Sequence, residues 1–459
     1  MTERLPRLLL AAPASGSGKT TATCAILRAL VLEGVAAASF KCGPDYIDPM
    51  FHRACVGVRR AGNLDLFFST PQQVRRLLAQ GAAGAQIAVL EGAMGLYDGI
   101  ACTEDASAYQ LARQTQTPIL LVVDARGMAL SVCAQIKGLR EFRPDAPVAG
   151  VLLNRVSPGL YPELKAAVER ECGLPVAGYL PRLPQGSLES RHLGLVTAGE
   201  VADLRQRLDA LAAQAKETVD FDLLWRIARS APPLRYEPEL LPQLEGRPVI
   251  AVAQDRAFCF YYQETLELLE ALGARLCPFS PLEDGTLPPG TQGMLLGGGY
   301  PELYAAQLAE NLPMRRAVAA AVAAGLPTIA ECGGFLYLHR TLQDPQGNSH
   351  PMAGALDGEG LCGQKLGRFG YVTLRARTGG LLCPEGETLA AHEFHYWQST
   401  QPGADFWAQK PHRQTGWAAG RHTRTLYAGF PHLYLPGAPQ AAVRFLQAAA
   451  GIKEEATWN

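Results

Sequence analysis

The sequence predicts an α/β protein with two domains. Its 459 residues are too many for one ordinary hydrophobic core. Short apolar runs alternate with helical patterns along the chain, and these runs are continuously apolar, as expected for parallel strands that are covered on both faces. Residues 231–247 are rich in Pro, Leu and charge without periodicity, so we expect a linker there between two sets of elements.

The first set of elements, in residues 1–230, predicts a doubly wound and mainly parallel sheet. A helix over 22–32 follows the first strand, and an amphipathic helix is expected over 201–217. The predicted strands are residues 8–12, 35–41, 87–92, 119–124, 148–154 and 176–181.

The second set, in residues 248–459, starts with a strand at 249–253 and a helix over 261–272. A strand at 293–296 and another that ends at Cys332 follow, and the last part of the chain is richer in β-strand patterns. Residues 343–359 contain several Gly, Pro, Asp and Asn residues, so we expect a loop there.

Composition excludes several classes of partner. Hydrophobic residues make up 48% of the chain and charged residues 19%, which is typical of a folded, soluble protein. The 42 Lys and Arg residues nearly balance the 43 Asp and Glu residues, so small molecules are expected as partners, and neither nucleic acid nor a membrane. No run approaches the roughly 20 apolar residues of a membrane span. The 11 cysteines form no C-x-x-C pair, which favours a reducing cytoplasm over a disulfide framework or a zinc site.

Residues 13–21, PASGSGKTT, predict a phosphate-binding loop between the first strand and its helix. Glycines let backbone N–H groups converge on phosphate oxygens, Lys19 would neutralise the β and γ phosphates, and the Thr20 hydroxyl would bind Mg²⁺. Pro13 stands where the usual pattern has its first glycine, and the alternative is a purely structural turn. The residues expected to bind the nucleotide in this loop are Gly16, Ser17, Gly18, Lys19, Thr20 and Thr21.

Polar side chains follow several of the other predicted strands. Glu91 ends one strand, and Asp45 and Asp48 follow another, at the sheet edge where doubly wound folds bind ligands. Together with the Thr20 hydroxyl they predict a site for a hard cation; the alternative for each is an ordinary turn or capping carboxylate.

Two further residues at strand ends are candidates for contacts with the nucleotide. Asn154, which Arg155 follows, could recognise an adenine edge through its amide, and Asp124 is a candidate nucleotide-facing group. A structural role is the alternative for both.

Cys332 lies in residues 327–336, PTIAECGGFL, a pattern that predicts a nucleophile elbow. A sharp turn between strand and helix lifts the thiol clear of the backbone, and the N–H groups there can favour the thiolate and bind an oxyanion. The alternative is a buried core cysteine.

A catalytic thiol needs a base, and His432 lies just past another predicted strand, where a histidine would meet a strand-end cysteine. His392 and His395 are its rivals. Residues 297–302, GGGYPE, offer free N–H groups after a strand. The residues expected to form an oxyanion hole are Gly298, Gly299 and Gly333.

Six segments, in the same order along the chain, resemble the family of cobyrinic acid and hydrogenobyrinic acid a,c-diamide synthases. The most specific is GPDYIDP. The segments are residues 15–21, 43–49, 91–99, 297–302, 331–334 and 393–396.

The resemblance implies a dethiobiotin-synthetase-like N-terminal domain that uses ATP and Mg²⁺ to phosphorylate a carboxylate, and a flavodoxin-like class I glutamine amidotransferase domain. It implies that Thr20, Asp48 and Glu91 bind the Mg²⁺ and that Cys332 releases ammonia from glutamine. It also implies a corrinoid polycarboxylic acid as substrate, amidated on its a and c acetate side chains in cobalamin biosynthesis, and a homodimer is expected. The loop expected to face the substrate carboxylate consists of Asp45, Tyr46 and Ile47.

One departure from the class I pattern concerns the triad. Such glutaminases usually have Glu two residues after the histidine, whereas this chain has Tyr434, so a Cys332–His432 dyad is expected. Alternatives with the same domain pair are cobyric acid synthase and nickel-sirohydrochlorin a,c-diamide synthase. A P-loop partitioning or regulatory ATPase with an inactive glutaminase-like domain is a further alternative, although Ala14 stands where such ATPases place a signature lysine.

Overall fold

The computed structural model describes residues 1–182, 198–239, 241–242, 244, 246–363 and 365–452, and the side chains of residues 198–202 are outside this description. The chain forms two compact units, Met1–Pro238 and Glu239–Asn459. Both are α/β units built on parallel sheets, so the predicted fold class is confirmed.

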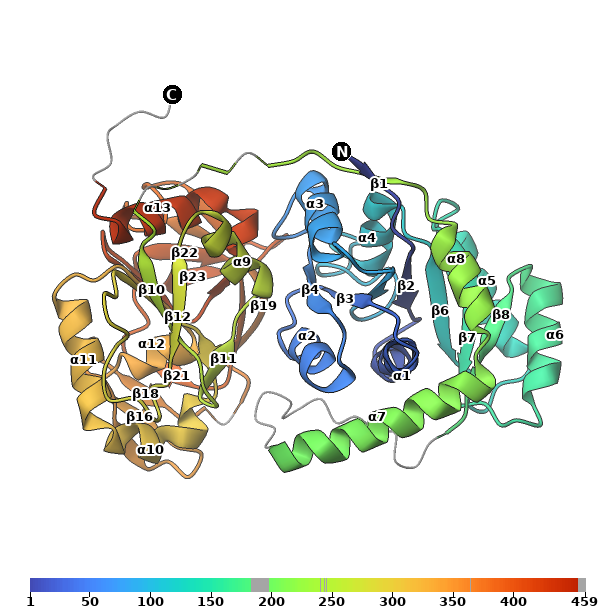
Figure 1. Cartoon of the computed structure of the whole chain (residues 1–459), viewed down its shortest axis with the longest axis horizontal. Helices are drawn as coiled ribbons and strands as arrows, with labels where there is room; N and C mark the ends of the chain where they lie inside the picture. Colours follow the sequence, from blue (N-terminus) through green and yellow to red (C-terminus); the bar gives the residue numbers. More distant parts are fainter. Residues whose placement is uncertain (183–197, 240, 243, 245, 364, 453–459) are drawn as a thin grey trace. The chain divides into compact units, whose positions relative to one another are not determined.

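The sheet of the first unit has seven parallel strands in the order β4-β3-β5-β2-β6-β7-β8 (Figure 1). The sequence predicted all of them except β4, which lies at the edge. The strands are β2 (Arg7–Ala11), β3 (Ala37–Cys42), β4 (Arg60–Leu64), β5 (Ile87–Glu91), β6 (Ile119–Asp124), β7 (Val148–Asn154) and β8 (Val176–Leu180).

Helices cover both faces of this sheet, so consecutive residues of its strands are buried. Leu8 and Leu10 of β2 share one core with α1 (Lys19–Leu32), α7 (Ala198–Thr218) and α8 (Phe221–Arg229). Leu9, which points to the other face of the strand, is equally buried. The remaining helices of this unit are α2 (Ile47–Phe51), α3 (Pro71–Gly81), α4 (Ala108–Thr115), α5 (Ser131–Phe142) and α6 (Tyr161–Cys172).

The first and last residues of the first unit lie side by side. The short strand β1 (Thr2–Glu3) pairs antiparallel with β9 (Leu234–Arg235). Arg7, whose side chain is fully buried, donates a hydrogen bond to the carbonyl of Pro232 (2.8 Å) and another to that of Thr115 (2.9 Å). The expectation of a plain linker from residue 231 onward was therefore wrong for its first residues, which belong to the fold of this unit.

The second unit is built on the sheet β12-β10-β13-β15-β25-β24, which is parallel except for the edge strand β24. The helices around it are α9 (Gln263–Ala271), α10 (Ala305–Glu310), α11 (Leu312–Ala323), α12 (Gly333–Tyr337) and α13 (Pro439–Ala449). The strands are β10 (Val249–Ala253), β12 (Arg275–Phe279), β13 (Gly293–Leu296), β15 (Thr328–Glu331), β24 (Arg421–His422) and β25 (Leu426–Gly429).

Antiparallel strands account for the β-rich end that the sequence predicted. One five-stranded sheet has the order β23-β22-β19-β20-β26. The loop prediction for residues 343–359 was wrong in part, because β17 (Ser349–Pro351) pairs there with β16 (Thr341–Gln343). The five strands are β19 (Arg368–Ala376), β20 (Thr388–His395), β22 (Phe406–Gln409), β23 (Gly416–Ala419) and β26 (His432–Leu433).

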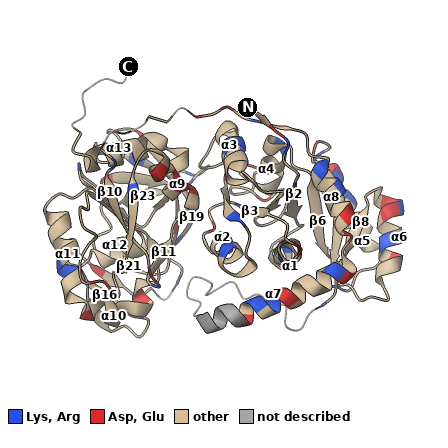
Figure 2. Cartoon of the chain, in the orientation of Figure 1, with Lys and Arg blue, Asp and Glu red and all other residues tan. Residues whose placement is uncertain are grey.

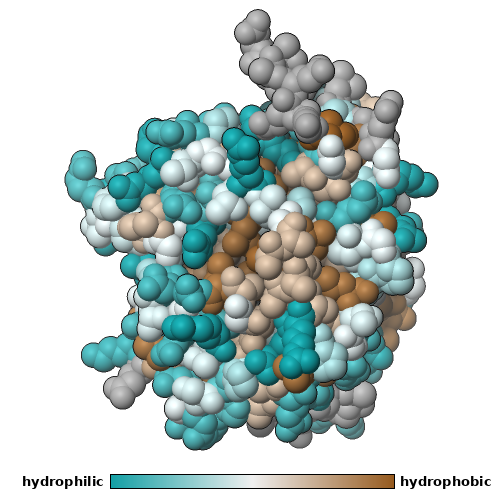
Figure 3. All heavy atoms as spheres, turned by 90° about the vertical axis from the view of Figure 1, so that its left-hand side faces the viewer, coloured by the Kyte–Doolittle hydropathy of each residue, from teal (hydrophilic) through white to brown (hydrophobic). Residues whose placement is uncertain are grey.

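Charged residues of both signs are mixed along two helices of the first unit. Basic and acidic residues are interspersed along α6 and α7 (Figure 2). The face of the second unit that is turned to the viewer in Figure 3 mixes hydrophilic and hydrophobic residues, with the hydrophobic ones gathered near its middle. Within the described ranges, no helix combines the length and the hydrophobicity that crossing a bilayer requires.

Candidate active sites

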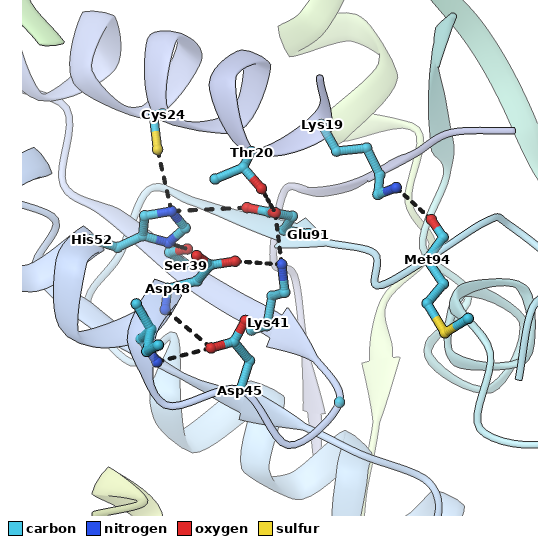
Figure 4. Close-up of polar contacts among 12 residues, drawn as sticks. Lys19, Thr20, Cys24, Ser39, Lys41, Asp45, Asp48, His52, Glu91 and Met94 are labelled. Atoms are coloured by element: carbon cyan, nitrogen blue, oxygen red, sulfur yellow. Dashed lines mark hydrogen bonds and ion pairs between the residues drawn. The ribbon is translucent and has the colours of Figure 1, made fainter. Parts of the chain in front are cut away.

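The loop between β2 and α1 has the backbone shape that phosphate binding needs. Gly16 and Gly18 have φ values of 78° and 92°, in the left-handed region that favours glycine. Nζ of Lys19 donates hydrogen bonds to the carbonyls of Ala14 (3.2 Å) and Met94, so its ammonium folds back along the loop (Figure 4). Burial and the nearby Lys41 lower the pKa of Lys19 to about 8.

A buried cluster of charges lies next to this loop, where β3 and β5 end. Lys41 and Glu91 are register partners on these neighbouring parallel strands, so their side chains leave the sheet on the same side. Nζ of Lys41 lies 2.7 Å from Oε1 of Glu91 and 2.5 Å from Oδ2 of Asp48, between the two carboxylates (Figure 4). The Thr20 hydroxyl donates to the same Glu91 oxygen at 2.6 Å. Burial alone would lower the pKa of Lys41, but Glu91 and Asp48 outweigh it and raise this pKa well above its ordinary value.

A buried histidine also contacts this cluster of charges. His52 is fully buried, and its Nδ1 shares a hydrogen bond with the Ser39 hydroxyl (2.7 Å). Its Nε2 lies 3.5 Å from Sγ of Cys24 and 3.8 Å from Oε2 of Glu91. Burial lowers the pKa of His52, so the ring stays neutral and helps to fix Glu91 without adding charge.

The donor atoms at this site fit Mg²⁺ in part. Carboxylate and hydroxyl oxygens are the ligands that this ion prefers, and those of Glu91 and Thr20 are already in contact. Oε2 of Glu91 is buried and accepts no hydrogen bond from the described residues, which leaves it available to a cation. Asp48 is different, because its carboxylate is paired with Lys41. In the described part of the chain, no three His, Cys, Asp or Glu residues are grouped as a ready metal site.

The predicted substrate loop lies beside the same cluster. Oδ1 of Asp45 accepts hydrogen bonds from the backbone N–H groups of Ile47 (2.8 Å) and Asp48 (3.3 Å), which fixes the first turn of α2. Burial and the neighbouring Asp48 raise the pKa of Asp45 to about 6. The Tyr46 side chain is buried and that of Ile47 is half-buried. Among these three residues, Asp45 carries the charge that interacts with Asp48.

Asn154 has a different contact from the adenine edge that the sequence suggested. Its Nδ2 donates to the carbonyl of Ser17 (2.8 Å), and its Oδ1 accepts from the N–H of Arg155 (3.0 Å). A Cβ on Gly18 would lie 2.1 Å from the same Nδ2, so the amide is packed against the phosphate loop. Asp124 pairs with the guanidinium of Arg155. These contacts show that Asn154 holds the loop, and recognition of an adenine edge by its amide stays a prediction.

Cys332 occupies a sharp turn between β15 and α12 in the second unit. Its backbone has φ 49° and ψ −101°, a conformation that non-glycine residues rarely adopt and that is typical of strained functional turns. Its N–H donates to the carbonyl of Gly429 (2.8 Å), which ties the turn to β25. Sγ lies 3.9 Å from the carbonyl oxygen of Phe394.

His432 is the histidine that the structure brings to Cys332. Burial alone would lower the pKa of His432, but the interactions of its ring with Cys332 and Glu331 outweigh this and raise it to about 10. Nδ1 of His432 lies 3.6 Å from Oε2 of Glu331, a distance typical of an ion pair and longer than a direct hydrogen bond. Tyr434 is buried, with its ring 5.0 Å from that of Tyr262.

The two rival histidines have other neighbours. His392 is the register partner of His432, and its ring packs edge-on against Phe369. His395 stacks on Phe430 with ring centres 3.8 Å apart, and its Nδ1 shares a hydrogen bond with the carbonyl of Trp397 (2.7 Å). His395 therefore helps to build the wall of the site.

The predicted oxyanion glycines lie against the Cys332–His432 pair. A Cβ on Gly298 would be 2.5 Å from Cε1 of His432, so the imidazole rests directly on this glycine. A Cβ on Gly333 would be 3.1 Å from the backbone N of Gly299, which places that N at the turn after Cys332. The structure thus brings together the thiol, the imidazole and all three glycines.

The sequence reasoning missed two charged residues at these sites. Lys41 is the last residue of a predicted apolar strand, and a single lysine at such a position is itself a signal of a buried counter-ion. Glu331 lies at the end of the predicted strand that leads to Cys332. A carboxylate that ends an apolar strand, directly before a candidate nucleophile, could have been singled out by the same argument.

Comparisons with known proteins cover nearly the whole chain. Residues 8–195 match the model of the CobQ/CobB/MinD/ParA nucleotide binding domain, and residues 249–439 match that of the CobB/CobQ-like glutamine amidotransferase domain. A cobyrinate a,c-diamide synthase from Gloeobacter violaceus is 40% identical over 454 residues, which cover 98% of each chain. Those from Salmonella typhimurium and Caldanaerobacter subterraneus subsp. tengcongensis are 39% and 38% identical, over 98% and 95% of this chain and 100% and 97% of theirs.

Proposed function

The chain belongs to the cobyrinate a,c-diamide synthase family, and on this premise we propose that it amidates the a and c acetate side chains of cobyrinic or hydrogenobyrinic acid, with ATP and glutamine, in cobalamin biosynthesis. One observation carries the proposal. The same chain holds a phosphate loop beside a buried cluster of charges and, in its other unit, a thiol beside a histidine of raised pKa. A ligase that uses glutamine nitrogen needs both.

The glutaminase half of the reaction is assigned to the second unit. Sγ of Cys332 attacks the glutamine side-chain amide, and His432 donates a proton to the nitrogen that leaves as ammonia. The backbone N–H groups of Gly299 and Gly333 are assigned to the oxyanion that forms at the carbonyl, which the closeness of Gly299 N to the turn at Gly333 supports. Water then hydrolyses the glutamyl thioester, which releases glutamate and restores the thiol.

The activation half is assigned to the first unit. The γ-phosphoryl group of ATP passes to a carboxylate oxygen of the acetate side chain, and ammonia then displaces phosphate from the acyl phosphate. Lys19 supplies positive charge where the phosphates bind, and Lys41 holds the carboxylates of Glu91 and Asp48 beside them. Mg²⁺, held by Thr20 and Glu91 with Asp48 nearby, would supply further charge to the same oxygens.

The substrate loop is proposed to present the acetate to the phosphoryl group. Asp45 supports this, because it is held next to Asp48 and its raised pKa allows it to share a proton with a substrate carboxylate near neutral pH. Tyr46 and Ile47 continue the loop at the start of α2.

The decisive experiment is mass spectrometry of the products that the enzyme forms with ATP and glutamine from a panel of acids. Diamides of cobyrinic or hydrogenobyrinic acid are expected. Amidation only at other peripheral positions would indicate a cobyric acid synthase, and amidation only of nickel-sirohydrochlorin would indicate that enzyme's activity. Absence of any amide product would contradict the proposal.

The division of labour has its own test. Cys332→Ala should abolish amidation with glutamine and preserve amidation with ammonium salts, because only the ammonia source is removed. Cys362→Ala, at a half-buried cysteine elsewhere in the unit, is the matched control and should change neither rate. Loss of both rates in Cys332→Ala, with the control intact, would contradict separate sites.

A further inference from the structure

The Cys332–His432 pair lacks an acid at the position where class I glutaminases usually have one, since Tyr434 stands there. A lone imidazole beside a thiol can rotate and can carry its proton on either nitrogen. A third group that fixes both properties is part of most such constellations. The acid that fixes the His432 ring must therefore lie among the other neighbours of that ring.

Glu331 is the carboxylate that meets Nδ1 of the His432 ring. The separation of 3.6 Å between Oε2 and Nδ1 is that of an ion pair. Because Nδ1 faces Glu331, the nitrogen that remains for Cys332 is Nε2. The ring thus has an acid on one side and the thiol on the other.

The turn at Cys332 explains how two consecutive residues reach one ring. In a regular strand, successive side chains point to opposite faces of the sheet. The φ of 49° at Cys332 breaks this alternation directly after Glu331, the last residue of β15. The same strained turn that carries the nucleophile therefore aims the preceding carboxylate at the imidazole.

The Glu331 side chain is itself held in place. Its Oε1 accepts a hydrogen bond from the backbone N–H of Leu433 at 3.0 Å, and Leu433 is the residue after His432 on β26. The side chain is only 13% exposed. One oxygen thus binds the backbone of the short strand that carries His432, while the other faces the ring of His432.

Other titratable groups also surround the His432 ring. His392, Glu393 and His395 approach from β20, and Cys332 approaches from the turn. Burial raises the pKa of Glu393, and the charges of Arg368 and Lys410 oppose this rise. Glu331 is the acid at ion-pair distance from Nδ1.

We propose that Glu331 is the positioning residue of the glutaminase site, which holds Nδ1–H of His432 so that Nε2 faces the thiol and receives its proton. The proton moves from Sγ of Cys332 to Nε2 and later to the nitrogen of the departing ammonia, so the carboxylate keeps its charge throughout. The acid thus precedes the nucleophile in the chain and does not follow the histidine. This inference rests on the glutaminase part of the proposed function.

Glu331→Gln is the variant that isolates the charge. Its amide oxygen can still accept from Leu433, while the negative charge at Nδ1 is lost. We expect kcat for glutamine hydrolysis to fall on the order of 10- to 1,000-fold with KM changed less than threefold. Amidation driven by ammonium salts should stay within twofold. Glu331→Asp, which restores a carboxylate, should recover part of the lost kcat.

The matched control is Asp405→Asn. Asp405 is a half-buried carboxylate of the same unit that accepts a hydrogen bond from the backbone N–H of His422 (2.7 Å), so its loss perturbs a similar contact away from Cys332. Its kcat for glutamine hydrolysis should remain within twofold of the wild type.

Two further measurements separate positioning from folding. The His432 ring, followed by NMR with labelled histidine, should titrate at lower pH in Glu331→Gln than in the wild type. Alkylation of Cys332 by iodoacetamide near neutral pH should slow in the same variant.

Unchanged hydrolysis, titration and alkylation in a folded Glu331→Gln protein would overturn the proposal. If Glu331→Gln does not fold, an ordinary pKa near 6.5 for His432 in the wild type would overturn it instead. Because hydrolysis and alkylation need no corrinoid, both outcomes stand even if the corrinoid substrate is wrong.

Discussion

Lys41 and Glu91 are register partners on the neighbouring parallel strands β3 and β5, and their charged atoms lie 2.7 Å apart in the interior of the first unit. Asp48 approaches the same ammonium from the start of α2. One cation therefore compensates two buried carboxylates, next to the loop that is built to hold phosphates. Both the stability and the chemistry of this unit should depend on that cation.

Replacing the cation tests this dependence. Lys41→Met should lower the free energy of unfolding of the first unit by about 3–5 kcal/mol, because it leaves buried carboxylates without a partner. ATP-dependent amidation should be lost as well. Lys137→Met is the control, because Lys137 forms an exposed ion pair with Glu171 at 3.9 Å. In this variant the free energy of unfolding, measured with urea, should change by less than about 1 kcal/mol. A Lys41→Met protein as stable as this control would contradict the argument.

The hydroxyl of Thr20 should be needed for phosphoryl transfer and not for glutamine hydrolysis in the second unit. Thr20→Val removes the group that contacts Glu91, so ATP-dependent amidation should fall at least tenfold while glutamine hydrolysis persists. Thr23→Val, one turn further along the same helix, removes a buried hydroxyl that accepts and donates no hydrogen bond among the described residues, and it should be neutral. Titration of both variants with Mg²⁺ should show a weakened response for Thr20→Val alone.

Gly298 should tolerate no side chain. The Cβ of Gly298→Ala would lie 2.5 Å from Cε1 of His432, so the imidazole must move away from the thiol. Glutamine hydrolysis should fall at least tenfold, and amidation with ammonium salts should survive. Gly285→Ala, where a Cβ meets nothing within 4 Å, is the control. Equal rates of glutamine hydrolysis in the two variants would show that the ring does not rest on Gly298.

Stability of the second unit should depend on pH through His432. Its pKa is raised in the folded protein to about 10 from an ordinary value of 6.5, so protonated His432 stabilises the fold fully below about pH 6.5, and this contribution is lost as pH rises through about 10. The melting temperature of the wild type should therefore fall between pH 7 and 10 by more than that of His432→Gln. Parallel melting curves for the two proteins would contradict a raised pKa.

Much of the architecture was predictable because the parallel strands are buried on both faces and therefore apolar. The edge strand β4, RAGNL, was missed, since an edge strand is not required to be an apolar run. Strand β17, SHP, was missed within a turn-rich stretch because its strand conformation comes from pairing with β16 and not from its own pattern.

The candidate sites were predictable where a residue's role is local. The phosphate loop and the turn at Cys332 are set by consecutive residues, and the sequence indicated both. Lys41 and Glu331 act through partners that are 50 and 101 positions away in the chain, so only the folded structure brings those charges together. The contact of Asn154 with the phosphate loop was missed for the same reason, because the carbonyl that accepts from its amide belongs to Ser17, 137 positions earlier in the chain.

The backbone of Cys332 has a consequence for how this protein can change. A residue with φ near 49° and a side chain is strained by roughly 1–3 kcal/mol, and glycine at that position would relieve the strain. A single substitution would thus remove both the nucleophile and the strain of its turn. A lineage that is selected only for heat resistance, with ammonia abundant, would have no reason to keep that strain.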